Sequence, residues 1–123
     1  MEGQNAIARH GPEGVAVGGV EHTQSVFVPW RGEVTEWHAE SFEALTPDHF
    51  ARLAALAPEL VIFGSGARIR FPPPVLIRAL IDARIGIETM DTAAACRTYN
   101  VLYAEGRSVV AGLLFAPAAA GRV

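Results

Sequence analysis

Pro58 to Phe115 carries the alternation of patterns from which the fold class follows: PELVIFGSGARIRFPPPVLIRALIDARIGIETMDTAAACRTYNVLYAEGRSVVAGLLF. Its apolar run at residues 60–63 is bounded by Pro58 and Gly64, which is typical of a strand buried on both faces of a parallel sheet. The sequence after it predicts, in order, a helix (73–84), a strand (87–90), a helix (91–104) and a strand (107–115). Strands that alternate with helices pair in parallel through right-handed crossovers, so this segment predicts an α/β fold.

The half of the chain before Pro58 has a different pattern. Residues 14–39 alternate strand-forming residues with turn residues, which predicts an antiparallel hairpin unit and a third strand beside or upon the sheet. Within it, Gly18 and Gly19 suggest a bulge or a close backbone approach. Thr46 and Pro47 then start a helix that reaches about residue 57. We expect a flexible N-terminal arm (1–13), a single α/β domain (14–116) and a flexible tail (117–123).

Composition excludes several classes of function. The chain has 123 residues, half of them apolar, which suits one globular domain. The net charge of -3 argues against a nucleic-acid surface, and the absence of lysine excludes Schiff-base chemistry and a P-loop. One cysteine allows no internal disulfide, and no apolar run approaches the roughly 20 residues of a membrane span. We therefore expect a cytoplasmic protein that is not transmembrane.

Ligands of α/β sheets bind beyond the carboxyl ends of parallel strands, which here are the loops after Phe63 and Met90. We expect these two loops to lie close together. The glycine loop, defined as Gly64–Gly66 and including Ser65, could present backbone amides to a small anion with help from Arg68. The alternative is an ordinary tight turn. In the second loop, Asp91 and Thr92 can cap the helix that follows.

That helix contains the one weak catalytic candidate, Cys96. The helix dipole and the neighbouring Arg97 would favour a thiolate, whereas the surrounding alanines favour an inert cysteine in close helix packing. Arg97 and Asn100 share one helix surface and could recognise a carboxylate or bridge to the glycine loop. The four histidines are dispersed without ligand spacing, so we expect no metal and no cofactor.

Phe71 and the three prolines that follow it form what we call the proline ridge, residues 71–74. Prolines at the start of a helix lose no hydrogen bond, so the ridge can be a rigid connector. An exposed ridge containing Phe71 and Pro73 could also receive a partner.

Three segments resemble a known family, the small domain of unknown function shared by many bacterial proteins and the mitochondrial respiratory complex I assembly factor 3. They are PELVIFGSGARIRFPPP, GIETMDTAAACRTYNVL and EGRSVVAGLLF. The resemblance implies a three-layer α/β fold with a β-hairpin element packed on a central mixed, largely parallel sheet. The family positions that carry over are Gly64, Gly66, Phe71 to Pro74, Asp91, Thr92, Cys96, Arg97, Thr98, Tyr99 and Asn100.

The resemblance also implies a function, since the mitochondrial member helps to build a membrane-bound complex through protein contacts. The first hypothesis is therefore a non-catalytic protein-interaction module without a cofactor. We expect it to act at an inner-membrane complex or its assembly machinery, with a location peripheral to that membrane as one expectation. The alternative is a small-anion or metabolite-binding domain, or a thiol enzyme. Its crevice would lie between the glycine loop and the helix start at Asp91 to Arg97.

Overall fold

The structure is a computed structural model that describes residues 4–116. Its larger sheet has five strands in the order β5-β4-β8-β6-β7. β6 pairs in parallel with β7 and with β8, whereas β4 pairs antiparallel with β8 and with β5. The bounds are Val26–Pro29 for β4, Thr35–Glu36 for β5, Leu60–Gly64 for β6, Gly86–Met90 for β7 and Val109–Leu113 for β8. The sheet is therefore mixed, which confirms the predicted α/β class.

A second, three-stranded sheet contains β1 (Ile7–Gly11), β2 (Gly14–Val17) and β3 (Val20–His22) in that order. The predicted bulge at Gly18 and Gly19 is wrong. These glycines have φ values of 59° and 82° and form the two-residue turn between β2 and β3. Both φ values are positive, as a tight hairpin turn that matches strand twist requires, and glycine adopts them without strain.

The expectation of a loose arm over residues 1–13 is corrected by β1. Ile7 is buried, and β1 pairs with β2 along its length. The side-chain amide of Asn100 also binds this strand, since its Oδ1 accepts from the Ile7 N–H (2.9 Å) and its Nδ2 donates to the Ile7 carbonyl (2.8 Å). Asn100 therefore acts as a structural partner of β1. The expected tail, residues 117–123, lies outside the described residues.

Three α-helices and one short 3₁₀ helix complete the fold. They are η1 (Phe42–Ala44), α1 (Pro47–Ala54), α2 (Arg78–Asp82) and α3 (Thr92–Ala104). The helix predicted from residue 73 begins only at Arg78. Residues 74–77 instead form turns in which the N–H groups of Leu76 and Ile77 donate to the carbonyl oxygens of Pro73 and Pro74. The residues that precede a proline are also disfavoured in the α region.

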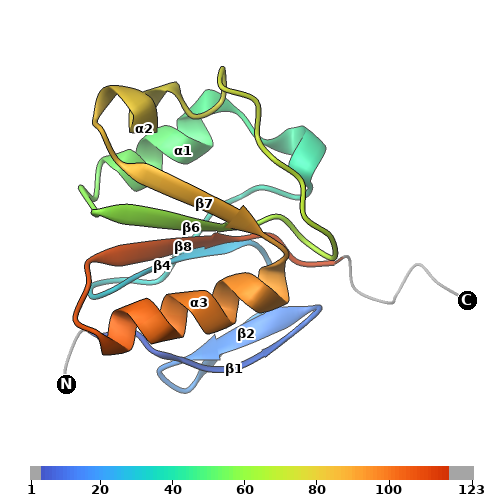
Figure 1. The fold of residues 1–123 in the computed structure, drawn as a ribbon. Coiled ribbons are helices and arrows are strands. Elements are labelled where there is room, and N and C mark those ends of the chain that lie inside the picture. Colours follow the sequence, from blue (N-terminus) through green and yellow to red (C-terminus); the bar gives the residue numbers. More distant parts are fainter. Residues whose placement is uncertain (1–3, 117–123) are drawn as a thin grey trace, which may run out of the picture.

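The layers follow from these contacts. Figure 1 shows α1 and α2 over one face of the five-stranded sheet and α3 over the other, with β1 and β2 beyond α3. α3 contacts β6 and β8 on one side and β1 on the other. The expected arrangement has three layers, with a hairpin beside or upon a largely parallel main sheet. The observed one has a separate small sheet on the outer side of α3, and the main sheet has two parallel and two antiparallel pairings.

Each face of the main sheet has its own apolar cluster, centred on a fully buried aromatic side chain. On the α1 side, Trp37 packs edge-on against Phe50 and Phe63, and its Nε1 donates to the His49 carbonyl at 3.0 Å. On the α3 side, the Tyr99 hydroxyl donates to the carbonyl oxygens of Asn5 (2.7 Å) and Pro29 (3.0 Å). Both polar atoms are satisfied, as burial requires.

The histidine at position 49 is structural. The backbone N–H of Thr46 donates to its Nδ1 at 3.0 Å, which completes a capping box at the start of α1. Its Nε2 then carries the proton and donates to the His38 carbonyl at 3.0 Å. His49 therefore orders the turn before α1.

We predict that Gly112→Ala destabilises the fold. A Cβ at Gly112 would lie 2.8 Å from the Trp37 ring, which is buried and has no room to move. Overpacking of this kind costs about 1–3 kcal/mol, measurable as a lower urea midpoint of unfolding. Gly11→Ala is the matched control, because a Cβ there meets nothing within 4 Å. Equal midpoints for the two variants would contradict the prediction.

Candidate functional site

The two loops at the carboxyl ends of β6 and β7 lie together, as predicted. Ser65 donates its backbone N–H to the Met90 carbonyl (2.9 Å), and Thr92 donates its own to the Gly66 carbonyl (2.9 Å). The Thr92 hydroxyl accepts from the Gly66 N–H (2.9 Å) and donates to the Leu114 carbonyl (2.6 Å). One buried hydroxyl thus joins the segments that follow three parallel strands.

These bonds correct the interpretation of the glycine loop as an anion cradle. The N–H groups of Ser65 and Gly66 are already used within the protein. Gly64 is a packing residue, since a Cβ there would meet Ala95, Leu113 and Thr92 at 3.0 Å each. Glycine at this position lets α3 approach β6 closely. The loop is therefore the structural turn that the alternative interpretation described.

Ser65 has a structural task in the same loop. Its side chain is buried, and its Oγ accepts from the Arg70 N–H at 2.9 Å. The same hydroxyl donates to the Arg68 carbonyl at 2.7 Å, and the Met90 carbonyl is a second, longer acceptor at 3.2 Å. Ser65 therefore fixes the course of the chain between the glycine loop and the proline ridge.

A cavity of about 380 Å³ opens beside these loops. Its lining comes from Gly66 and Ala67, from the start of α3 at Asp91 to Ala93, and from residues 10–12 at the end of β1 and just after it. Asp91 accepts from the Ala94 N–H at 2.9 Å and so caps α3 as predicted. Arg68 and Arg97 do not line the cavity, whereas the acidic residue Asp91 does. The charge of the residues that line this cavity therefore does not favour binding of the small anion that the sequence suggested.

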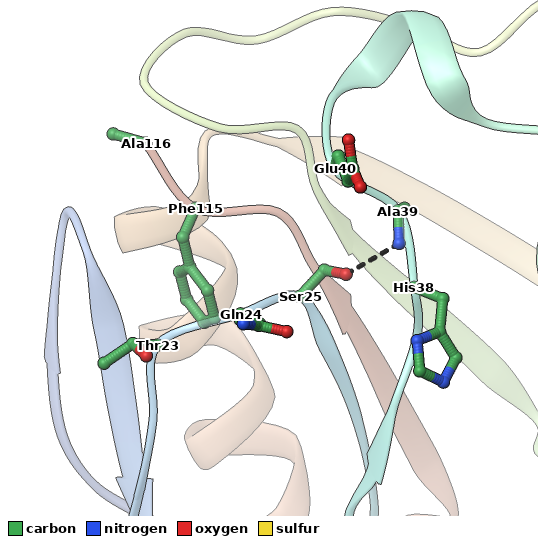
Figure 2. Close-up of a pocket in the computed structure, with 8 residues that line it drawn as sticks. All are labelled: Thr23, Gln24, Ser25, His38, Ala39, Glu40, Phe115 and Ala116. Atoms are coloured by element: carbon green, nitrogen blue, oxygen red, sulfur yellow. Dashed lines mark hydrogen bonds between the residues drawn. The ribbon is translucent and has the colours of Figure 1, made fainter. Parts of the chain in front are cut away.

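A second cavity of about 370 Å³ lies at the same edge of the sheet, beyond the carboxyl end of β8. Figure 2 shows its three lining segments, residues 23–25, 38–40 and 115–116. Ser25 Oγ accepts from the Ala39 N–H at 2.8 Å, and this hydrogen bond joins the segment 23–25 to the segment 38–40. His38 next to it has a φ of 61°, in the left-handed region that non-glycine residues seldom adopt.

The cysteine is not arranged for catalysis. Cys96 is fully buried within the apolar cluster on the α3 side, among Ala95, Tyr99 and Ala111. Loss of hydration raises the pKa of its thiol to about 12, and the opposing influence of Arg97 is smaller. Cys96 is therefore a core residue, as the alternative interpretation stated.

The proline ridge is the most exposed apolar part of the described chain. Phe71 is 70% exposed and Ile69, just before the ridge, is 49% exposed, whereas Pro72 between the exposed residues is buried. Arg70 anchors this segment, because its guanidinium binds Glu43 at 2.7 Å and lies 4.1 Å from the centre of the Phe42 ring. The ridge is thus held in place and turned toward solvent.

Other predicted residues lie apart from this ridge. Arg97 is exposed on α3, and Asn100 binds β1 instead of the glycine loop. Among residues 4–116, no group of three histidine, cysteine or acidic side chains could hold a metal ion. No helix in the described part of the chain is both long and apolar enough to cross a membrane.

Two contributions to this region were missed in the sequence. Residues 10–12 line the first cavity, and Glu43 holds Arg70. Ile7 is the one large apolar residue of β1, and a single such residue gives too little hydrophobic periodicity to predict a strand. No local pattern links Glu43 to an arginine that is distant in the sequence.

We predict that the native thiol alkylates slowly from pH 7 to 10. A thiol with a pKa of about 12 has little thiolate in this range, and burial also blocks the reagent. Iodoacetamide labelling measured against pH should therefore stay nearly flat for the folded chain. The same chain in urea is the control and should show an inflection near the ordinary value of 9.0. A native inflection at or below that value would restore Cys96 as a nucleophile.

Comparison with known proteins connects this geometry to a family. The family described as a protein of unknown function (DUF498/DUF598) matches residues 7–114. The chain is 35% identical over 86 residues to NADH dehydrogenase (ubiquinone) 1 alpha subcomplex assembly factor 3 of Bos taurus, covering 68% of this chain and 47% of that protein. It therefore spans about half the length of the assembly factors that it matches.

Bacterial relatives match over more of their length. An uncharacterized protein of Rhodobacter capsulatus is 36% identical over 92% of this chain and 86% of its own. The crystal structure of a Bordetella parapertussis protein aligns with a TM-score of 0.87 at 34% identity, covering 93% of this chain and 98% of that one. On the family match and these relatives together, the chain belongs to the DUF498/DUF598 family of proteins of unknown function.

Proposed function

We propose that this protein is a non-catalytic interaction module that assists the assembly of a membrane-bound protein complex. The proposed place of action is the cytoplasmic face of the inner membrane, with the protein peripheral to it. Support comes from relatives that are named as assembly factors of NADH dehydrogenase and are similar over 68% of this chain. The two cavities and the buried thiol offer no set of reacting groups that favours an enzyme.

The observation that carries the proposal is the exposed proline ridge. Phe71 is 70% exposed, so its ring buries little apolar surface and contributes little to the stability of the fold. A partner that covers the ring would bury that surface and gain the corresponding binding free energy. Aromatic and arginine side chains are the residue types that most often supply binding energy at interfaces. Of the predicted binding set, the glycine loop, Asp91, Thr92 and Asn100 stabilise the fold. Arg97 is exposed but lies on α3, apart from the ridge, so Arg68, Phe71 and Pro73 are the members at or beside the ridge.

We predict that Phe71→Ser separates the protein from its partner without unfolding it. The tagged full chain, captured from its own cells after mild crosslinking, should retain a subunit or assembly protein of a membrane complex. Phe71→Ser should reduce that subunit by about tenfold or more, because truncating a central aromatic anchor typically costs over 2 kcal/mol. The urea midpoint should stay nearly unchanged, because the side chain is exposed.

Val101→Ser is the matched control. Val101 is also an exposed apolar residue, at 58%, but it lies on α3, on the opposite face of the main sheet from α1 and α2. Its variant should capture the same subunit at the parent level. Equal losses for both variants, or no membrane-complex protein captured by the parent chain, would refute the proposal.

A further inference from the structure

We infer that residues 69–73 are a docking strand that binds an extended segment of the partner protein, one that is both acidic and apolar. The partner's main chain would pair with Ile69 and Phe71, and an apolar pocket would receive the Phe71 ring. This inference rests on the proposed function and adds the binding mode and the chemistry of the partner.

The first observation is the shape of the segment. Residues 69–73 contain no turn or bend and belong to neither sheet. Prolines at 72, 73 and 74 fix their own φ and keep the residues before them out of the helical region. The segment is therefore extended before any partner arrives, which lowers the entropic cost of binding.

The second observation is the alternation of its side chains. Ile69 and Phe71 point to solvent, while Pro72 is buried and Arg70 reaches inward to Glu43 and the Phe42 ring. Alternation with a period of two is the pattern of a β-strand that has one face on the protein and the other free. Two apolar side chains of the free face are thus presented side by side.

The third observation concerns the backbone. The Arg70 N–H points into the protein, where it donates to Ser65 Oγ at 2.9 Å. Successive N–H groups of an extended chain point in opposite directions, so those of Ile69 and Phe71 point away. Within residues 4–116, no hydrogen bond reaches the N–H or C=O of either residue. A row of unpaired groups of this kind is what β-strand addition uses.

Charge indicates the composition of the bound segment. Residues 60–81 include Arg68, Arg70 and Arg78 and no acidic residue. Glu43 pairs with Arg70, and the charge of Arg68 also helps to lower the pKa of that carboxyl. Neither Arg68 nor Arg78 forms an ion pair of its own among the described residues, including with Asp82 one turn along α2. Arginine binds carboxylates in a bidentate geometry, so acidic side chains beside the apolar ones complement this surface.

An anionic membrane fits this surface less well. Electrostatic binding to anionic lipid typically uses clusters of about 4–8 basic residues, and the chain as a whole has a net charge of -3.

The prolines limit the length of the strand pairing, because Pro72 and Pro73 have no N–H to donate. The expected contact is therefore a short ladder at Ile69 and Phe71 with the phenylalanine ring as its anchor.

The test starts with a random peptide library displayed on phage and selected on the full chain. Enriched peptides should carry aspartate or glutamate next to leucine, isoleucine or phenylalanine. Fluorescence anisotropy of one such peptide should show a loss of about tenfold or more for Phe71→Ser and no change for Val101→Ser. The double variant Arg68→Gln, Arg78→Gln should weaken binding and reduce its dependence on salt.

A backbone measurement separates strand pairing from side-chain contact alone. In the free protein, the amide hydrogens of Ile69 and Phe71 should exchange rapidly, because neither is hydrogen-bonded. Saturation with the peptide should slow both by about tenfold or more. The Arg70 amide, already bonded to Ser65, serves as the internal control and should change little.

Three outcomes overturn the inference. One is enrichment of peptides that lack acidic residues or that bind Phe71→Ser as well as the parent. Another is unchanged exchange at Ile69 and Phe71 in the saturated complex. The third is Phe71-dependent binding to phosphatidylglycerol vesicles with no peptide enriched, which would assign the surface to a membrane. In each case the proposed function still stands if the captured membrane-complex subunit depends on Phe71.

Discussion

The buried hydroxyl of Thr92 is the point on which the carboxyl edge of the main sheet depends. It accepts from the Gly66 N–H at 2.9 Å and donates to the Leu114 carbonyl at 2.6 Å. The segments that follow β6, β7 and β8 are therefore fixed relative to one another before any ligand binds. Both cavities described above lie along this edge: residues joined by these bonds line the first, whereas the bond from the Ala39 N–H to Ser25 Oγ holds two segments of the second. A buried polar group of this type contributes most when every bond is made.

Ser65 extends the same order outward to the surface. Its hydroxyl connects the end of β6 to the backbone of Arg68 and Arg70, and the Arg70 side chain then binds Glu43 and the Phe42 ring. The proline ridge is thus joined to the core by a short series of contacts. An apolar surface held in this way loses less entropy on binding than a mobile loop does, which suits an interaction module. Conversely, the backbone N–H groups of Ser65 and Gly66, which were expected to bind an anion, already donate hydrogen bonds that stabilise the turn.

Several elements could be predicted because their signals are local. The apolar run at residues 60–63 and the capping residue Asp91 both depend on neighbours in the sequence, and the structure places them as expected. The α2 helix was predicted too long, because apolar spacing over residues 73–84 took no account of how three prolines disfavour a helical start. β1 was missed because its pairing with β2 and with Asn100 is formed by distant residues.

The sequence by itself determined the order of strands and helices from β6 to β8, the parallel pairing of β6 with β7, and membership of a family that its motifs resemble. Hydrophobic periodicity and turn residues act over a few positions, so they can be recognised without the rest of the chain. Only the tertiary structure decided that Cys96 is in the core, that the glycine loop has its amides satisfied, and that Phe71 is free. Burial and hydrogen-bond partners are properties of residues brought together from distant positions, and a single sequence does not state which ones meet.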